Sequence, residues 1–568
     1  MKKSSIFYSI LFSSIILGGY KILGYLGVTI APTIKRATYP ILMHNTFTTN
    51  EEIDRIILLS LITSTIVLFV LNKKNKFFKF SFRKFVFTSL WIVLIFETIS
   101  ILRWLIYPII ETDYLSSIDW QITIIETDIY YFLALASSVL TVFLLFSWLI
   151  KRIVITTITM IKDTEQIKNS LINSLYFTHK FSDYKIGEIS KRERNFILLA
   201  IIIIAIIIPL TPYIPSINPD NYTVSVDVRL YNVWLEPLEE DITNLHLGTN
   251  LGDRPLSLLT IYSIEKTFGI EQHKLLQYFP VLLTPIFCIS VYLAVREGTK
   301  NELTAVICSA FSLVSYITLV GIYAGLFSNW LAVIVIFFSI YFLLRYFNRY
   351  KKEDFLIFSI LLILSFFFHS YSAYYFGISL VFFLIFSTIS NSIQKKNAFI
   401  VGIMIVTALL INYTYTEIIV EVPSSFEFVQ SFLGNSAITI ENFAERWETI
   451  FFIMTVREGG IFSNSIMIGL AIFWIITMNF RNKFEVLLFS HMPIITLLFL
   501  FGNATIQSRQ FYVLPVILFA TLGAIKITKY FEFKTQEKWI FFSALIAFNT
   551  NYLLRTLMNL YLVLPEKT

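Results

Sequence analysis

The sequence predicts an all-α polytopic membrane protein. Hydrophobic residues make up 56% of the 568 residues, and charged residues make up only 15%, whereas a soluble chain carries about 25% charged residues. The mean hydropathy is +0.71. Apolar runs of about 20 residues, the length that crosses a bilayer as a helix, recur along the whole chain. Strand-like alternation is confined to residues 222–231.

The apolar runs define about fifteen transmembrane helices. They cover residues 5–31, 53–72, 85–109, 129–150, 196–211, 277–295, 303–323, 329–347, 354–369, 371–390, 397–413, 461–479, 485–502, 511–528 and 539–562. Two of them meet at His369 and Ser370, so we expect a tight corner there.

The distribution of Lys and Arg orients the chain. With the N-terminus inside, alternating connections put most of the 45 Lys and Arg residues on the inner face. Cytoplasmic loops carry such an excess of cations, so the long segments 211–274 and 413–460 are expected outside. The net charge of +7 is then mainly an inner-face property. It suggests membrane lipids with anionic headgroups as partners, and no nucleic acid. The expected location is the cell (plasma) membrane.

The chain divides into two membrane blocks. Residues 1–195 contain four spans and a basic inner linker, and residues 196–568 form a core with the outer loops 211–274 and 413–460. Both cysteines, Cys288 and Cys308, fall in spans, so no disulfide framework is expected. The apolar run at the N-terminus is long and lacks a clear cleavage site, which indicates an uncleaved first span.

The loop 211–274 is the longest polar segment between apolar runs, and it concentrates acids beside the bilayer. A carboxylate there can take a proton from a hydroxyl, and guanidinium groups can hold an anionic phosphate. The candidate side chains on the predicted outer face, with a histidine among them, are Asp220, Asp227, Arg229, Asp253, Arg254, His369, Arg457 and Arg509. This combination suits glycosyl transfer from a lipid phosphate, which passes through an oxocarbenium-like state.

The order of the segments resembles the GT-C superfamily of polytopic membrane glycosyltransferases, especially its archaeal members. The matching segments are Asp227 with VRLYNVWL, GDRPLSLLTIYSIEKTFG (252–269), QYFPVLLTPIF (277–287), VREGTKNELTAV (295–306), GIYAGLFSNWLA (321–332), FFFHSYSAYYF (366–376) and QSRQFYVLPVILFA (507–520). The resemblance covers residues 196–530, and the first four spans fall outside it.

The resemblance implies a large first outer loop with a catalytic acid near its start. On that alignment Asp227 is the catalytic acid and Asp220 the second. The residues predicted to bind the substrate, from their chemistry and predicted outer position, are Arg229, Asp253, Arg254, His369, Arg457 and Arg509. The implied reaction moves a sugar from a polyprenyl-phosphate carrier to a lipid-linked glycan or a cell-surface acceptor at the outer face.

A different class of function stays open at this point: a non-catalytic scaffold, or a transporter or flippase of lipid-linked glycans. A transporter or flippase would use ionisable groups inside the spans. Glu97 can also form an ion pair with Arg103 or Arg555 that has only a structural role. The cofactor is undefined. Asp227 with Asp253 or Glu240 is compatible with a divalent metal, but no ligand spacing demands one.

Overall fold

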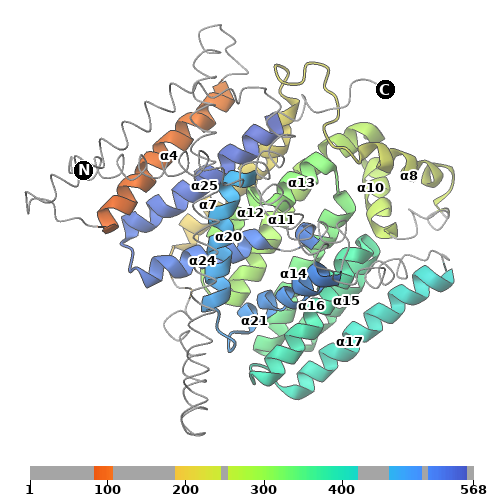
Figure 1. Cartoon of the computed structure of the whole chain (residues 1–568). Helices are drawn as coiled ribbons and strands as arrows, with labels where there is room; N and C mark the ends of the chain where they lie inside the picture. Colours follow the sequence, from red (N-terminus) through yellow and green to blue (C-terminus); the bar gives the residue numbers. More distant parts are fainter. Residues whose placement is uncertain are drawn as a thin grey trace, which may run out of the picture. The chain divides into compact units, whose positions relative to one another are not determined.

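The computed structural model describes residues 82–106, 184, 186–242, 244, 254–419, 460–501, 510–513 and 515–558. These ranges are helical and contain no β-strand (Figure 1). The alternation at residues 222–231 therefore does not form a strand, because the helix α8 begins at Val228. The predicted spans 5–31, 53–72 and 129–150 lie outside the described residues.

The helices agree closely with the remaining apolar runs. In chain order they are α4 (Phe82–Ile106), α7 (Lys191–Ile207) with the 3-10 turn η2 (Ile208–Tyr213), α8 (Val228–Glu240), α10 (Pro255–Phe268), α11 (Gln272–Thr299), α12 (Glu302–Leu313), α13 (Tyr316–Ala324), α14 (Phe327–Arg349), α15 (Lys352–Phe368), α16 (Ser370–Ile389), α17 (Lys395–Tyr413), the π-helical turn η4 (Thr414–Ile419), α20 (Gly460–Thr477), α21 (Lys483–Phe489), α22 (His491–Phe501), the 3-10 turn η6 (Gln510–Tyr512), α24 (Val516–Tyr530) and α25 (Thr535–Met558).

Six helical stretches in the described part are long and apolar enough to cross a membrane, so the chain is an integral membrane protein. They are Lys191–Tyr213, Gln272–Thr299, Glu302–Ala324, Phe327–Arg349, Ser370–Ile389 and Lys395–Thr416. The most apolar part of Glu302–Ala324 is 94% buried inside the protein, whereas that of Lys395–Thr416 is 28% buried. The α12–α13 stretch is therefore a central helix, and α17 presents most of its surface to the surroundings.

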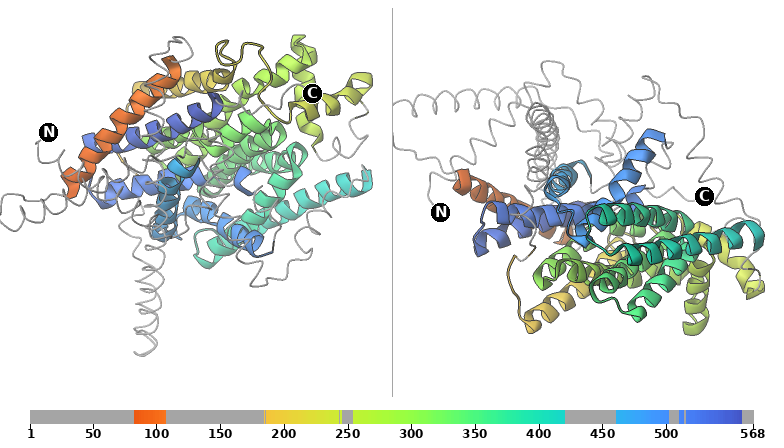
Figure 2. Two further views of the ribbon diagram at one scale, coloured as in Figure 1. Left: turned by 45° about the horizontal axis from the view of Figure 1, so that its top comes forward. Right: turned by 90° about the horizontal axis from the view of Figure 1, so that it is seen from below.

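The chain forms two compact units. One comprises Met1–Phe146, Phe451–Gly469 and Glu532–Thr556, and the other comprises Ser147–Ile450, Leu470–Phe531 and Leu557–Thr568. In the second unit α11 packs against α7, α12 and α14. The helices α15, α16 and α17 pack against one another, and α14 packs against α15 and α16. Figures 1 and 2 show α15, α16 and α17 running alongside each other. The predicted boundary at residue 195 stays a prediction.

Because successive helices of the second unit run back and forth, its connections gather at two ends. We call the end with α8, α10 and the corners α13–α14 and α15–α16 the acidic end. The opposite end carries the corners α11–α12, α14–α15 and α16–α17, and we call it the basic end.

Two predicted spans are each divided into two helices. The run 303–323 breaks at Val314, and α13 starts anew because the Ser315 side chain accepts a hydrogen bond from Thr318 N at 3.3 Å. The run 485–502 breaks at Ser490, whose hydroxyl donates to Leu487 O at 2.5 Å. Hydropathy cannot detect such breaks, since apolar residues continue through both.

The first unit contains a polar contact between distant helices. Asn551 Nδ2 on α25 donates to Glu97 Oε2 on α4 at 2.6 Å, and Ser100 Oγ donates to Asn551 Oδ1 at 3.2 Å. All three side chains are buried. The side chains of Arg103 and Arg555, the predicted partners of Glu97, lie outside the described residues.

Candidate functional site

The position of Asp227 is set by its backbone. The residues just before α8 cover the open C-terminal end of α13: Val226 N donates to Tyr323 O at 3.0 Å, and Asp227 N donates to Ala324 O at 2.9 Å. Ser225 Oγ adds a hydrogen bond to Ile322 O at 2.6 Å. The last carbonyls of a helix lack hydrogen-bond donors within it. The segment before α8 supplies these donors to α13, and the same hydrogen bonds fix its position.

Gly325 makes this close approach possible. It ends α13 with φ +69°, in the left-handed region, and a Cβ added there would lie 3.0 Å from Ser225 Cβ and 3.5 Å from Asp227 N. A residue with a side chain would therefore be strained and would push against the segment that carries Asp227.

Asp227 occupies the N-cap position of α8, but its side chain does not cap the helix. The residue is half-buried. One helical turn later, the buried Tyr231 lies on the same face of α8. The Asp227 carboxylate and the Arg254 guanidinium both act electrostatically on the Tyr231 hydroxyl, in opposite directions. An acid and a base from the two helices of the long loop therefore share one neighbourhood.

Tyr231 ties α8 to the first turn of α14. Its hydroxyl oxygen accepts a hydrogen bond from Ser328 N at 2.8 Å and lies 2.9 Å from Ser328 Oγ. Burial raises the pKa of Tyr231 above its ordinary value of about 10, so the phenol is neutral at physiological pH. Its ring also packs against Phe327, with 5.2 Å between the ring centroids.

Arg254 is held by an aromatic face. The residue occupies the N-cap position of α10, ahead of Pro255, and its guanidinium carbon lies 4.8 Å from the centroid of the Trp234 ring. Trp234 in turn makes an edge-to-face contact with Tyr231 at 5.1 Å. A planar guanidinium stacked in this way is held in one orientation and keeps N–H groups at its edge for an anion.

The corner between α15 and α16 joins the same end of the unit. His369 Nδ1 lies 2.8 Å from Ser372 Oγ and accepts a hydrogen bond from Ser372 N at 3.3 Å. The Ser372 hydroxyl donates to Asn329 Oδ1 at 2.6 Å. Asn329 follows Ser328, so the His369 corner and the Tyr231 contact meet on one turn of α14.

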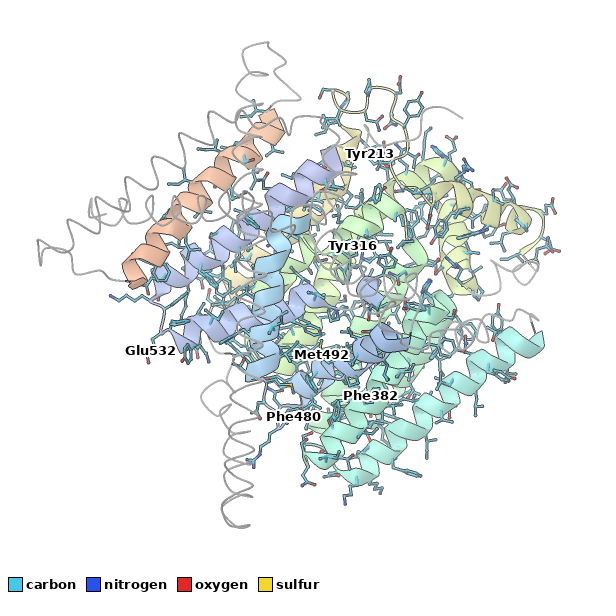
Figure 3. The ribbon with its side chains drawn as sticks, viewed as in Figure 1. Tyr213, Tyr316, Phe382, Phe480, Met492 and Glu532 are labelled. Carbon is cyan, nitrogen blue, oxygen red and sulfur yellow. The ribbon has the colours of Figure 1, made fainter. Side chains whose placement is uncertain are left out.

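Two further links close the arrangement. Ser257 Oγ, in the first turn of α10, donates to Phe368 O at 2.7 Å, next to His369. Asn329 Nδ2 donates to Tyr512 O at 3.2 Å, and the Tyr512 ring stacks on Tyr316 with 6.1 Å between centroids (Tyr316 is labelled in Figure 3). Segments around residues 227, 254, 328, 369 and 512 thus form one connected set.

Some buried polar groups near this set have no partner among the described residues. They are Nε1 of Trp330, beside Asn329, and both amide atoms of Gln510, two residues before Tyr512. Trp330 and Gln510 are 1% and 0% exposed. Buried polar atoms are almost always hydrogen-bonded, so these groups are suited to bind a polar molecule or water.

The other sequence-predicted site residues are distributed differently. Asp220 is exposed in a turn closed by Asn218, whose side chain bonds both backbone groups of Tyr222. Arg229 is exposed, about half a turn around α8 from the buried Tyr231. Neither side chain forms an ion pair or a hydrogen bond with the described residues. Asp253, Arg457 and Arg509 lie outside the described residues.

Tyr231, Trp234, Ser328 and Ser372 belong to the site but were not predicted from the sequence. The helical spacing of Tyr231 and Trp234 after Asp227 was a usable signal, since residues four apart share a face. Ser328 and Ser372 are ordinary polar residues at the ends of apolar runs, and no local pattern separates them from other such residues.

A metal site is not formed by the described residues: they contain no group of three or more His, Cys, Asp or Glu side chains placed to bind an ion together. Asp227 and Glu240 cannot bind one metal ion together, because they lie at opposite ends of α8, about 20 Å apart at 1.5 Å per residue. Asp253, the other residue considered as a metal ligand with Asp227, lies outside the described residues.

Comparison of the chain with protein-family models, with curated proteins and with solved structures found no match.

Proposed function

We propose that the chain is a membrane glycosyltransferase of the GT-C type that uses a sugar carried on a polyprenyl phosphate. The observation that carries the proposal is that two charged residues at the acidic end act on the same Tyr231 hydroxyl. They are the half-buried Asp227, whose backbone is held by hydrogen bonds, and Arg254, whose guanidinium stacks on Trp234. Glycosyl transfer from a lipid phosphate requires a group to accept a proton and a cation to stabilise the departing phosphate.

In the proposed reaction, Asp227 accepts the proton of the acceptor hydroxyl as its oxygen bonds to the anomeric carbon of the sugar. The bond between that carbon and the phosphate oxygen breaks, and the phosphate leaves with the electron pair. The Arg254 guanidinium binds this phosphate through paired N–H groups. The polar groups of Trp330 and Gln510, which have no partner among the described residues, contribute hydrogen bonds to the sugar or the acceptor.

The proposed acceptor is a lipid-linked glycan or a cell-surface molecule at the outer face of the plasma membrane. The distribution of basic residues supports this orientation, because the end opposite Asp227 carries the excess of Lys and Arg expected of a cytoplasmic face. Asp220 keeps its predicted role as the second acid. The predicted substrate contacts of the donor or acceptor remain Arg229, Asp253, His369, Arg457 and Arg509.

The alternative of transport depended on ionisable groups within the spans. Glu97, the acid on which it rested, is hydrogen-bonded to Asn551 between two helices. Among the described residues no specific observation favours transport over transfer.

The test is Asp227→Asn in full-length protein reconstituted with a panel of polyprenyl-phosphate mannose and glucose donors and membrane glycolipid acceptors. The variant should lose transfer by at least 100-fold, the order of a general-base contribution, and should elute and melt like the wild type. Glu236→Gln removes an exposed charge from the same helix and should transfer normally. Full activity of Asp227→Asn would exclude the proposed role. Loss in Asp220→Asn instead would move the base to the 218–222 turn.

A further inference from the structure

Five cations gather at the basic end of the second unit. Arg349, Lys351 and Lys352 lie at the corner between α14 and α15, and Lys395 and Lys396 begin α17. All five are exposed. None of their side chains forms an ion pair or a hydrogen bond with a described residue.

The two corners form one patch. Tyr346, one turn before the end of α14, donates a hydrogen bond from its hydroxyl to Asn397 Oδ1 in the first turn of α17 at 3.1 Å. The Tyr346 ring also contacts Tyr350 and Phe355, with 6.1 and 5.1 Å between centroids. One hydrogen bond and an aromatic cluster therefore join the two corners that carry the cations.

Few acids oppose these charges. Asp354 is paired with Arg345 at 3.0 Å, and Glu297 is held by Lys300 and by Asn348. Glu353 is exposed in the first turn of α15 and forms no ion pair with the described residues. Within the described part of the chain, the patch thus combines five cations with one carboxylate that form no ion pair, and it attracts anions.

The start of α17 adds backbone donors. Its N-cap residue Gln394 makes no capping hydrogen bond, and the first turn contains no acid. The first N–H groups of a helix lack partners within it, and they bind phosphate readily. At the same end, α7 differs, because Ser190 and Glu193 form a complete capping box around its first turn.

An apolar surface continues from the patch along the helices. On α17 it consists of Phe399, Ile403 and Val406, which are 70%, 51% and 56% exposed and share one face. Leu356 and Ile360 are exposed on α15, which packs against α17. One leaflet of a bilayer is about 15 Å thick in hydrocarbon, which corresponds to about ten residues of helix. The apolar surface reaches that depth.

We propose that this patch binds the phosphate of an anionic phospholipid. Lys395, Lys396 and the first N–H groups of α17 hold the phosphate, the three cations of the α14–α15 corner strengthen the positive field, and the acyl chains lie along α17 and α15. This site is at the opposite end from Asp227, and it does not depend on the proposed transferase activity.

The experiment measures lipid retention by native mass spectrometry of the full-length protein in detergent, with phosphatidylglycerol and phosphatidylcholine of the same acyl chains. The wild type should retain several-fold more phosphatidylglycerol than phosphatidylcholine. Lys395→Gln/Lys396→Gln should reduce phosphatidylglycerol retention at least threefold and leave phosphatidylcholine retention unchanged. The matched control Lys191→Gln/Arg192→Gln removes two exposed cations from the capped start of α7 and should behave like the wild type.

Equal retention of the two lipids by the wild type would contradict the proposed lipid site. So would a loss of phosphatidylglycerol retention in the control variant equal to that in Lys395→Gln/Lys396→Gln. Lys351→Gln/Lys352→Gln provides an independent variant should the first one fail to fold, and it should lose part of the preference. Inorganic phosphate serves as the soluble probe. If it raises the melting temperature as much as phosphatidylglycerol does, the ligand is free phosphate and the lipid assignment is wrong.

Discussion

Tyr231 connects the two halves of the candidate site at the scale of a single side chain. Its ring is buried against Phe327 and Trp234, and its hydroxyl accepts a hydrogen bond from Ser328 N in the first turn of α14. The helix that carries Asp227 is thereby fixed to a transmembrane helix through one oxygen atom. Removing that oxygen leaves a buried backbone N–H without its acceptor.

Tyr231→Phe should therefore lower the free energy of unfolding by about 1–3 kcal/mol, the cost of a buried unsatisfied donor. Melting in detergent followed by intrinsic fluorescence measures this loss.

Burial raises the pKa of Tyr231 in the folded protein, so the phenol is protonated in both states below about pH 9. The difference from the wild type should be constant between pH 6 and 9 and should shrink as pH rises above about 10. Tyr222→Phe alters an exposed hydroxyl of the same loop and should have no effect. A loss of equal size there would contradict the assignment.

Arg254 gives a second residue-scale prediction. Arg254→Lys keeps the charge but removes the planar group that stacks on Trp234. Affinity for polyprenyl phosphate, measured as a ligand-induced melting shift, should fall about tenfold, since a stacked and bidentate guanidinium contributes about 1–2 kcal/mol beyond a point charge. Lys266→Arg on the exposed side of α10 should leave the shift unchanged. Retained affinity in Arg254→Lys would mean that only the charge is used.

At the scale of elements, the close contact between α13 and the segment leading into α8 depends on Gly325. Gly325→Ala introduces strain at φ +69° and a contact of 3.0 Å with Ser225 Cβ. We expect a loss of about 1–2 kcal/mol from the left-handed conformation and a further loss of transfer activity because Asp227 moves.

Gly269 supplies the control for this element. It ends α10 with φ +62°, and a Cβ there meets nothing within 4 Å. Gly269→Ala should therefore show the conformational loss in melting temperature without the loss of activity. If both variants lose activity alike, backbone strain alone explains the effect, and the contact with the Asp227 segment is not important.

The positions of most helices follow from hydropathy, because a helix that crosses a membrane needs an uninterrupted apolar run. The sequence also indicated the corner at His369, since polar residues interrupt the run there. It did not indicate the breaks at Ser315 and Ser490, where a serine side chain bonds a nearby backbone group within an apolar run. It did not indicate that the long loop 211–274 contains the two helices α8 and α10, whose composition is mixed.

At the scale of the whole molecule, the site forms through contacts between distant residues. Asp227 and Arg254 were candidates from the sequence because the loop 211–274 concentrates charged side chains beside the apolar runs. Their surroundings were not, because Tyr231 meets Ser328 and Asn329 meets Ser372 only after the helices pack. Hydrogen bonds of this kind leave no periodic pattern in the sequence, and the exposure of Arg229 likewise depends on which face of α8 is covered.

The second unit also contains a fully buried ion pair far along the chain. Lys526 Nζ on α24 lies 2.8 Å from Glu485 Oε2 on α21 and donates to Thr477 O of α20 at 2.8 Å. Glu485 also accepts from Asn479 N at 2.6 Å, and Lys526 lies 5.3 Å from the ring centroid of Tyr184, ahead of α7. The pair therefore holds together three regions that are distant in sequence, around residues 184, 477–485 and 526.

Desolvation of both charges consumes much of their attraction, so the pair adds little net stability over a neutral replacement. Breaking it is different, because one charge is then left buried alone.

Lys526→Met should lower the free energy of unfolding by about 3–5 kcal/mol and reduce the yield of monodisperse protein on size exclusion. Lys526→Met/Glu485→Gln keeps an acceptor for Asn479 N and removes the stranded charge, so it should recover more than half of the loss in a double-mutant cycle. Lys274→Met, which breaks the exposed pair with Glu271, should change little. If the double variant melts no higher than Lys526→Met, the loss comes from packing of the lysine stem, and the ion pair does not specify how these segments assemble.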